Sequence, residues 1–296
     1  MSERLLLLAD GGATHIEWVG LDADGNLRCR FETSGINAVL MTDDEIYRRL
    51  KAEVAPRIDG FEIGCVKFFG AGCVSDDIKS MVERTIAKAL RAETVTADSD
   101  LLGAAIGLCG DKQGIVCILG TGSNSCYYDG VRLAHNVSPL GYILGDEGSG
   151  AVLGRRLVGD VLKKQLPERL CRDFLDRYGL DVTSIVKGVY RGESPSRFLA
   201  SFAPFLRENI HHPELKQLVL SEFCSFFRRN VSHYDVYGYF PINFTGSIAY
   251  HFSDILDEAA RLTGYELGVI MQSPVEGMIE YYSSRAASLS ARKRPV

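Results

Sequence analysis

Leu5-Leu-Leu-Leu-Ala-Asp-Gly-Gly-Ala-Thr14 and Gly114-Ile-Val-Cys-Ile-Leu-Gly-Thr-Gly-Ser-Asn124 are the two stretches of sequence that decide the fold. In each, a continuous apolar run ends at a turn rich in glycine, which is typical of a strand buried on both faces. Two further strand-like runs follow each turn, and helical patterns come next. A strand-strand-strand-helix order therefore occurs twice, which predicts an α/β protein built from two related halves.

The apolar pattern predicts the remaining elements and the domain boundaries. In the first half we expect strands at 16–21, 27–33, 66–69 and 94–96, and helices at 42–54, at 78–90 and from 98 onward. In the second half we expect strands at 126–128, 131–134, 242–244 and 267–271, helical structure over 150–234, and helices at 247–262 and 274–287. The expected domains are 1–110, completed by the C-terminal helix 274–296, and 111–273 with a helical insertion.

The composition excludes several classes of function. Of 296 residues, 46% are hydrophobic and 24% are charged, and the net charge is −5. General binders of nucleic acids or anionic membranes are usually basic, so we expect neither partner. No apolar stretch reaches the roughly 20 residues of a membrane-spanning helix, and no signal peptide is evident. We therefore expect a cytoplasmic protein whose eight cysteines, none in a C-x-x-C pair, are buried free thiols.

The two glycine turns are candidates for phosphate binding. Backbone N–H groups in such turns, together with the hydroxyls of Thr14 and Thr121, can hold phosphate oxygens. Asp10, at the end of a buried strand, could hold Mg²⁺ through water. One turn alone could be a plain hairpin, and neither is a Walker A loop, because G-K-[ST] is missing. Two such turns at equivalent places predict a nucleotide site in a cleft between two lobes.

Acidic residues near predicted helix starts are candidates for acid–base chemistry and for sugar binding. Asp100 could accept the proton of a substrate hydroxyl that attacks the γ-phosphoryl group, and Asp98 competes for this role. The alternative for both is a helix cap. In Gly141-Tyr-Ile-Leu-Gly-Asp-Glu-Gly-Ser-Gly150, carboxylates between glycines could accept hydrogen bonds from sugar hydroxyls or could be solvated in a turn. Asn243-Phe-Thr-Gly-Ser247 is a strand-to-helix turn that could contact an adenosine, or an ordinary connection.

Taken in order, these motifs resemble a known family. They are Asp10-Gly-Gly-Ala-Thr14, Asn37 after Gly35-Ile36, Asp98-Ser-Asp-Leu-Leu-Gly103, Gly120-Thr-Gly-Ser-Asn124, Gly145-Asp-Glu-Gly-Ser149 and Phe244-Thr-Gly-Ser-Ile-Ala249. The set looks like the N-acetylglucosamine kinase branch of the BadF/BadG/BcrA/BcrD ATPase family, within the sugar kinase/actin/Hsp70 superfold. The resemblance covers Leu5 to about Tyr281.

The resemblance implies two actin-like (ribonuclease H-like) ATPase domains, with nucleotide and sugar bound in a cleft between them. It implies Mg²⁺-ATP as phosphoryl donor, an amino sugar phosphorylated on its 6-hydroxyl as acceptor, and a homodimer. Asp100 would be the catalytic base, and Asp10 the metal ligand. ATP would contact Asp10, Gly11, Gly12, Thr14, Gly120, Thr121, Gly122, Gly246, Ser247 and Gly277. The sugar would contact Asn37, Asp100, Ser123, Asn124, Gly141 and Asp146.

Two departures from the family pattern bear on substrate and donor binding. Leu140 stands where relatives often carry Trp, which leaves open a kinase for another amino or cell-wall sugar. His15 follows Thr14 where many relatives have Lys or Arg. Two other classes stay open: an ATPase activator of an acyl-CoA dehydratase or reductase, which Cys117 before the second turn mildly suggests, and a non-catalytic sugar sensor.

Overall fold

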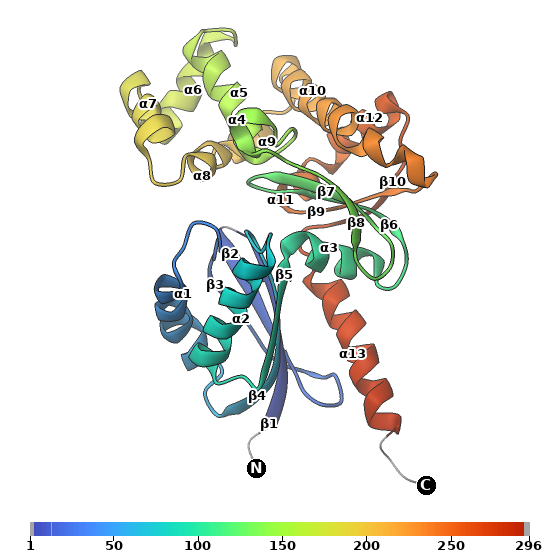
Figure 1. Ribbon diagram of the computed structural model, residues 1–296. Coiled ribbons are helices and arrows are strands. Elements are labelled where there is room, and N and C mark those ends of the chain that lie inside the picture. The colour runs from blue at the N-terminus through green and yellow to red at the C-terminus, as the bar shows by residue number, and fades with distance from the viewer. Residues whose placement is uncertain (1–2, 13, 293–296) are drawn as a thin grey trace. The chain divides into compact units, whose positions relative to one another are not determined.

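The computed structural model describes residues 3–12 and 14–292, with side chains described as far as Arg285. The chain divides into two compact units, Met1–Lys112 with Pro274–Val296, and Gln113–Ser273 (Figure 1). The first unit contains β1 (Glu3–Gly11), β2 (His15–Leu21), β3 (Leu27–Ser34), α1 (Asp43–Arg49), β4 (Phe61–Gly70), α2 (Asp76–Leu90), β5 (Thr94–Ser99), α3 (Asp100–Cys109) and α13 (Val275–Arg292).

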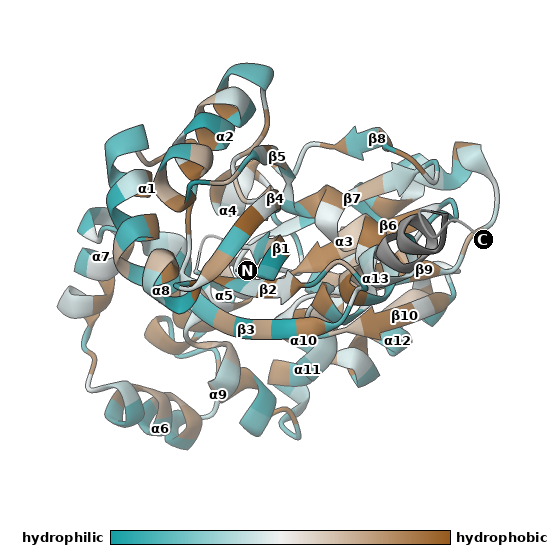
Figure 2. Ribbon diagram, turned by 90° about the horizontal axis from the view of Figure 1, so that it is seen from below, coloured by the Kyte–Doolittle hydropathy of each residue, from teal (hydrophilic) through white to brown (hydrophobic). Residues whose placement is uncertain are grey.

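The first unit is a five-stranded sheet in the order β3-β2-β1-β4-β5. The first three strands are antiparallel neighbours, and β4 and β5 run parallel to β1. One face of the sheet buries Trp18 and Phe68 against α1 and α2. The strand β3, at the edge of the sheet beside β2, alternates between apolar and polar side chains (Figure 2). The other face carries Leu8 and Phe69, which pack with residues of α3 and α13. The parallel arrangement brings the carboxyl ends of β1, β4 and β5 to one edge.

The second unit repeats this topology with the order β10-β9-β6-β7-β8. Its strands are β6 (Gly114–Leu119), β7 (Ser123–Tyr128), β8 (Leu133–Val137), β9 (Ile242–Thr245) and β10 (Leu267–Met271). Its helices are α4 (Gly141–Leu144), α5 (Gly150–Leu162), α6 (Glu168–Tyr178), α7 (Val182–Arg191), α8 (Pro195–Ala200), α9 (Ala203–Glu208), α10 (Pro213–Arg229), α11 (Ser247–His251) and α12 (Ser253–Thr263). These two α/β sheets confirm the predicted fold class.

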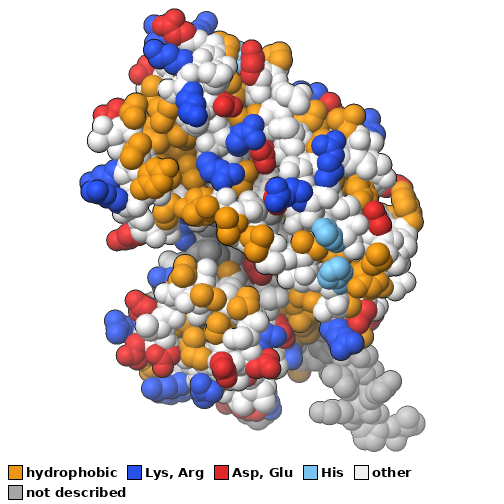
Figure 3. Space-filling view, turned by 45° about the horizontal axis from the view of Figure 1, so that its top comes forward, with side chains coloured by type: hydrophobic (Ala, Val, Ile, Leu, Met, Phe, Trp, Pro, Cys, Tyr) orange, Lys and Arg blue, Asp and Glu red, His pale blue; other side chains and the backbone are white. Residues whose placement is uncertain are grey.

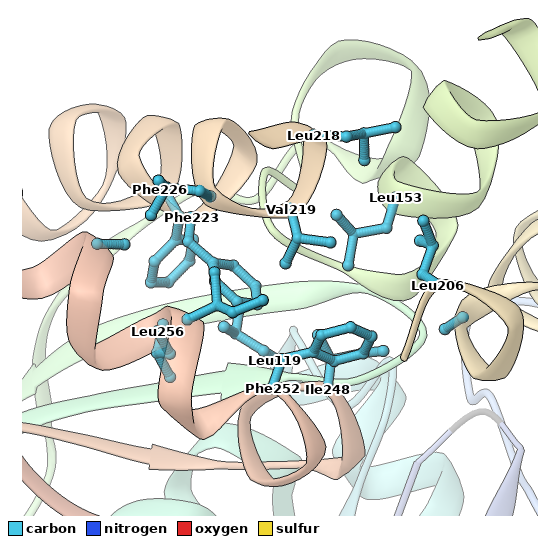
Figure 4. Packing of buried hydrophobic residues seen from close by; sticks show 14 of the residues in the cluster. Leu119, Leu153, Leu206, Leu218, Val219, Phe223, Phe226, Ile248, Phe252 and Leu256 are labelled. Carbon is cyan, nitrogen blue, oxygen red and sulfur yellow. The ribbon is translucent and has the colours of Figure 1, made fainter. Parts of the chain in front are cut away.

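The core of the second unit lies between its sheet and helices α10, α11 and α12. Phe223 and Phe226 of α10 point toward Leu119 of β6 and Leu256 of α12, and all four side chains are buried (Figure 4). The buried residues of α10 extend from Leu215 to Phe227, so core packing fixes the helix up to its last turn.

Three predicted elements differ from the structure. The helix expected at 42–54 is regular only to Arg49 and continues as a π-helical turn and a 3₁₀ turn, Ala55–Arg57, because Pro56 lacks an N–H and its ring crowds the preceding turn. The strand expected at 131–134 lies at Leu133–Val137, since Asp129 accepts hydrogen bonds from the N–H groups of Val131 and Arg132 and lengthens the turn.

The helix expected at 247–262 is interrupted at Phe252. This residue has φ −111° and ψ 27°, outside the helical region, and it separates α11 from α12. Its ring is buried and lies 6.4 Å from that of Phe223. Burial of one large ring therefore outweighs the helical preference of the local sequence.

The surface of the described chain mixes charges of both signs, as the face drawn in Figure 3 shows. Within the described residues, no helix combines the length and apolarity that a bilayer crossing requires.

Candidate functional site

The turn between β1 and β2 carries the first group of expected ligands. Gly12 donates its N–H to the carbonyl of His15 at 3.0 Å, which closes the turn. A Cβ on Gly12 would meet no atom closer than 3.8 Å, whereas one on Gly11 would lie 3.0 Å from Ile16 Cγ1. Gly12 and Thr14 are exposed. The turn therefore presents open backbone at Gly12, as close approach of a phosphate requires.

Asp10 and Asp100 lie at the carboxyl edge of the first sheet. Asp10 is near the end of β1, and Asp100 begins α3 directly after β5. Burial, followed by the charges of Asp100 and Glu17, raises the pKa of Asp10 to about 8. Burial also raises the pKa of Asp100 to about 6, opposed by a 2.9 Å hydrogen bond from the Leu101 N–H. The two carboxyl groups thus share an environment that disfavours charge on both.

Asp98 has a different environment from Asp100, although both were candidates for the base. Its Oδ1 lies 2.6 Å from Lys79 Nζ of α2, and both side chains are about one-third exposed. Asp100 forms no ion pair with any side chain that the structure describes. Lys79 neutralises Asp98, so Asp100 is the better placed of the two to take up a proton.

Asn37 reaches the same edge through a close loop contact. The side-chain oxygen Oδ1 of Asn37 accepts a hydrogen bond from the N–H of Val39 at 3.1 Å. A Cβ on Gly72, which has φ +85°, would lie 2.7 Å from that oxygen, so only glycine allows this approach. The N–H of Ala38 also donates to the carbonyl of Ala71 at 3.0 Å. These contacts bring Asn37 beside the turn that ends β4.

The second unit gathers two glycine turns around the start of α5. The carbonyl of Gly120 accepts the N–H of Gly150 at 2.8 Å, and the carbonyl of Thr121 accepts the N–H of Ala151 at 3.0 Å. A Cβ on Gly120 would meet nothing within 4 Å. The Gly120–Gly122 turn is thus anchored to α5 while its backbone at Gly120 stays open.

The turn after β9 joins this group. Gly246 has φ +109°, and a Cβ there would overlap the carbonyl of Leu119. Ser247 follows as the first residue of α11 and is exposed. The structure therefore brings the predicted nucleotide-binding residues of the second unit together at the carboxyl ends of β6 and β9, an edge where α/β sheets commonly bind ligands.

Asp146 is held in an unusual backbone conformation next to the Gly120–Gly122 turn. Its φ is +52°, its N–H donates to the carbonyl of Pro139 at 2.9 Å, and it is buried. Its Oδ1 accepts the N–H of Ser123 at 3.3 Å. Burial and the charge of Glu147 raise its pKa to about 6, opposed by the Ser123 hydrogen bond. A non-glycine residue with positive φ at a buried carboxylate is a feature of functional sites.

Glu147 points to different partners from its neighbour Asp146. Its Oε1 lies 2.8 Å from Arg229 Nε at the end of α10, and its Oε2 accepts a hydrogen bond from Asn230 Nδ2 at 3.2 Å. The two adjacent acids of the glycine-rich segment thus have different partners. Asp146 faces the Ser123 backbone, and Glu147 fastens the loop to α10.

Three other expected ligands have distinct surroundings. Asn124 accepts a hydrogen bond from Asn136 Nδ2 at 2.8 Å, which ties it to β8. Gly141 has φ +74° and open space around a Cβ. Gly277 lies in the first unit, where α13 passes so close to α3 that a Cβ would overlap the carbonyl of Gly107. Helix packing accounts for this glycine, and its predicted contact with ATP stays a prediction.

Sequence reasoning missed the partners of the acidic residues. Lys79, Arg229 and Asn230 carry no motif, and Asn230 is 83 residues from Glu147. Glu17 stands opposite Asp10 in the β1–β2 register, so its proximity follows from the predicted hairpin alone. The pairing of these two strands was therefore the one feature of the sequence that could have identified a partner of Asp10.

A cation bound by Asp10 at the carboxyl edge of the first sheet would need most of its ligands from phosphate oxygens and water. No group of three or more His, Cys, Asp or Glu side chains that could hold a metal occurs among the described residues. Mg²⁺ commonly takes one or two carboxylates and completes its shell with phosphate oxygens and water. Asp10 offers a carboxylate oxygen of the required kind, although burial and the charges of Asp100 and Glu17 disfavour its ionised form.

Comparison with known proteins identifies the family. No protein-family model matches the chain. A candidate N-acetylglucosamine kinase from Porphyromonas gingivalis, of known structure, is 43% identical, with coverage of 94% of this chain and 99% of that one and a TM-score of 0.89. The chain belongs to the N-acetylglucosamine kinase-like family. This family of sugar kinases is the one that the ordered motifs indicate.

Two further similarities are more limited. Glucosamine kinase GspK of Vibrio cholerae is 33% identical over 97 residues, so the match spans about a third of that protein's length. A ROK family glucokinase from Streptomyces griseus, in complex with glucose and AMPPNP, matches at 16% identity with a TM-score of 0.53 over 96% of this chain and 98% of that one. This second likeness shows that the kinase-like protein has the actin-like fold of such enzymes.

Proposed function

We propose that this kinase-like protein transfers the γ-phosphoryl group of ATP to the 6-hydroxyl of N-acetylglucosamine. The observation that carries the proposal is Asp100, a carboxylate with a pKa of about 6 at the start of α3, where it is paired with no cation of the described chain. Support for the acceptor comes from the name of the Porphyromonas gingivalis relative, and support for the donor from AMPPNP in the Streptomyces griseus glucokinase.

Asp100 would act as general base. At neutral pH a carboxyl group with a pKa of about 6 is mainly ionised and can accept a proton from a sugar hydroxyl. The N–H of Leu101 would hold one oxygen of the carboxylate in place. Phosphoryl transfer depends mostly on positioning and charge stabilisation, so orientation of the attacking hydroxyl is the main contribution of this residue.

The two glycine turns would hold the phosphates of ATP. Gly12 and Gly120 offer open backbone, and Thr14 and Thr121 bring a hydroxyl to each turn. Ser247 and Gly246 would lie near the adenosine. Asp10 would hold Mg²⁺, which when bound neutralises charge on the phosphates. Asp10 itself would have to lose the proton that burial, followed by the charges of Asp100 and Glu17, favours.

Five residues besides Asp100 would hold the acceptor: Asn37, Ser123, Asn124, Gly141 and Asp146. Ionised Asp146 would accept hydrogen bonds from sugar hydroxyls, because carboxylates accept but do not donate.

The test is ADP release with Mg²⁺-ATP over a panel of sugars: N-acetylglucosamine, glucosamine, N-acetylmannosamine, N-acetylmuramic acid and glucose. We expect turnover on N-acetylglucosamine that is lost in Asp100→Asn. Turnover on a different sugar would replace the acceptor and keep the kinase. ATP binding without turnover on any sugar would contradict the proposal and favour a sensor or an activator.

Glucosamine is the second candidate acceptor, and the name of the Vibrio cholerae relative favours it. Leu140 is the residue to examine for the choice between the two sugars, because it belongs to the same loop as Asp146 and its side chain is exposed. Its backbone φ is +62°. An apolar side chain suits an acetamido methyl better than an ammonium group. The activator hypothesis has less support, since Cys117 is fully buried and burial raises its pKa, whereas a metal ligand must be a thiolate.

A further inference from the structure

Among the described residues, two ion pairs connect helix α10 to the segment around α5, and one of the two reaches the loop 139–149, which carries Asp146. Arg229 Nε contacts Glu147 Oε1 at 2.8 Å, within that loop. Arg156 contacts Glu222 at 2.7 Å, on the regular part of both helices. The pairs are otherwise similar, because each joins an arginine that is half exposed or more to a carboxylate about one-tenth exposed.

The loop contains two of the four non-glycine residues with positive φ found in the described chain. These are Leu140 and Asp146, and such conformations persist only where the surrounding contacts enforce them. Backbone hydrogen bonds from Asp146 to Pro139 and from Ser149 to Asp146 close the loop on itself. The contacts of Glu147 with Arg229 and Asn230 attach the loop to the end of α10. On its other side, Arg155 of α5 donates a hydrogen bond to the carbonyl of Tyr142 at 2.8 Å.

The helix α10 is a rigid point of attachment. Its apolar face is buried in the core against Leu119 and Leu256, so the end of the helix is fixed relative to β6 (Figure 4). The turn Gly120–Gly122 follows β6 directly, and Asp146 contacts it through the N–H of Ser123. An anchor at Arg229 therefore sets the distance between the Asp146 carboxylate and the Gly120–Gly122 turn.

We infer that Arg229, with Asn230, positions Asp146 for the acceptor by holding Glu147. This inference rests on the proposed function, because it assigns Asp146 to the acceptor. Arg229 also pairs with Glu147, whose charge raises the pKa of Asp146, so loss of this ion pair should alter the electrostatic environment of Asp146. Arg229 is thus a positioning residue that acts through two neighbours and touches no substrate.

The charges around Asp146 define the pH dependence to expect. Glu147 is the charged group that acts directly on Asp146, and Arg229 of α10 pairs with Glu147. Arg155 and Arg156 of α5 act on Glu222 of α10 instead. Loss of Arg229 leaves Glu147 as an uncompensated charge, which raises the pKa of Asp146 above about 6. Glu147→Gln removes the same charge and lowers that pKa. The two substitutions break the same ion pair but shift the titration of Asp146 in opposite directions.

The kinetic experiment compares Arg229→Met with Arg156→Met as matched control and Arg229→Lys as partial rescue. We expect Arg229→Met to raise the acceptor KM roughly tenfold, with the ATP KM changed less than about twofold, because misplacement of a binding group affects the ligand it holds. Arg156→Met should change neither constant, and Arg229→Lys should recover part of the loss. Equal effects of Arg229→Met and Arg156→Met, or parallel changes in both KM values, would overturn the inference.

The second readout needs no substrate and separates this inference from the proposed function. Carbon-13 NMR of the aspartate carboxyl groups in the ligand-free protein, with Asp146→Asn for assignment, follows the titration of Asp146. We expect its midpoint to move upward in Arg229→Met and downward in Glu147→Gln. Movement in the same direction, or none, would refute the control by Arg229 even in an active kinase. Opposite movements in a protein without turnover would keep the electrostatic control and reject the acceptor role.

Discussion

The sheets β3-β2-β1-β4-β5 and β8-β7-β6-β9-β10 have the same topology, but acidic residues at their carboxyl edges meet different partners. In the first unit burial and the charge of Asp100 disfavour charge on Asp10. In the second unit the neighbour of Asp146, Glu147, is neutralised by Arg229. Both edges thus hold a buried carboxylate of raised pKa beside a glutamate that is paired with an arginine, Glu17 with Arg30 and Glu147 with Arg229. The first edge differs because a second buried carboxylate, Asp100, acts on Asp10.

The largest expected effect would test this contrast at Asp100. We predict that Asp100→Asn lowers kcat by about 10²–10⁴-fold, because the general base is lost, while the acceptor still binds. Steady-state kinetics and calorimetry measure the two quantities. The control is Asp98→Asn, which removes an ion-paired carboxylate and should retain most turnover. Inactivation by Asp98→Asn with an active Asp100→Asn would reverse the assignment.

Asp146 should affect binding where Asp100 affects turnover. We predict that Asp146→Asn raises the acceptor KM roughly 10- to 100-fold, since a hydrogen bond to a charged group contributes about 1.5–3 kcal/mol. The wild-type acceptor KM should also rise as pH falls through about 6, where Asp146 becomes protonated. Kinetics between pH 5 and 8 would check both statements. A loss confined to kcat would make Asp146 part of the chemistry instead.

Substitution of two glycines would distinguish a role in packing, expected for Gly246, from a role in ligand approach, expected for Gly120. Gly246→Ala should lower the melting temperature by several degrees, because its Cβ would overlap the Leu119 carbonyl and φ is +109°. Gly120→Ala meets open space, so it should leave the melting temperature unchanged and raise the ATP KM. Calorimetry and kinetics on the pair provide the comparison. Unchanged ATP affinity in a well-folded Gly120→Ala would remove that turn from the phosphate site.

The smallest expected effect is a change in the pH dependence of the melting temperature when Asp10 is substituted. Its folded-state pKa of about 8 lies above the ordinary 3.8, so the folded protein holds a proton that the unfolded chain releases. This stabilisation is complete below about pH 4 and is lost as pH rises through 8. Asp10→Asn should therefore melt at least about 2 °C above wild type at pH 8.5, with a smaller difference near pH 5. A pH-independent difference would mean that Asp10 titrates normally.

The sequence predicted the features that depend on local patterns. Apolar runs ending at glycine predicted the central strands, and doubling of the pattern predicted two α/β sheets. It failed where a tertiary contact outweighs local preference. Phe252 interrupts a helix, and its buried ring lies against that of Phe223, which a periodic pattern does not show because the pattern continues through the break. The early end of the regular helix before Pro56 has a local cause instead, the proline itself.

For the candidate site, the residues were readable but their partners were not. Asp98 and Asp100 are indistinguishable as letters two positions apart, and only packing of α2 beside β5 brings Lys79 to Asp98. In the same way, adjacent Asp146 and Glu147 differ because folding places Arg229 against one and the Ser123 backbone against the other. Neighbouring residues are enough to predict the central strands, the glycine turns and the supply of carboxylates, since these depend on local patterns. The tertiary structure decided which carboxylates carry charge, because pKa values depend on burial and on partners distant in the chain.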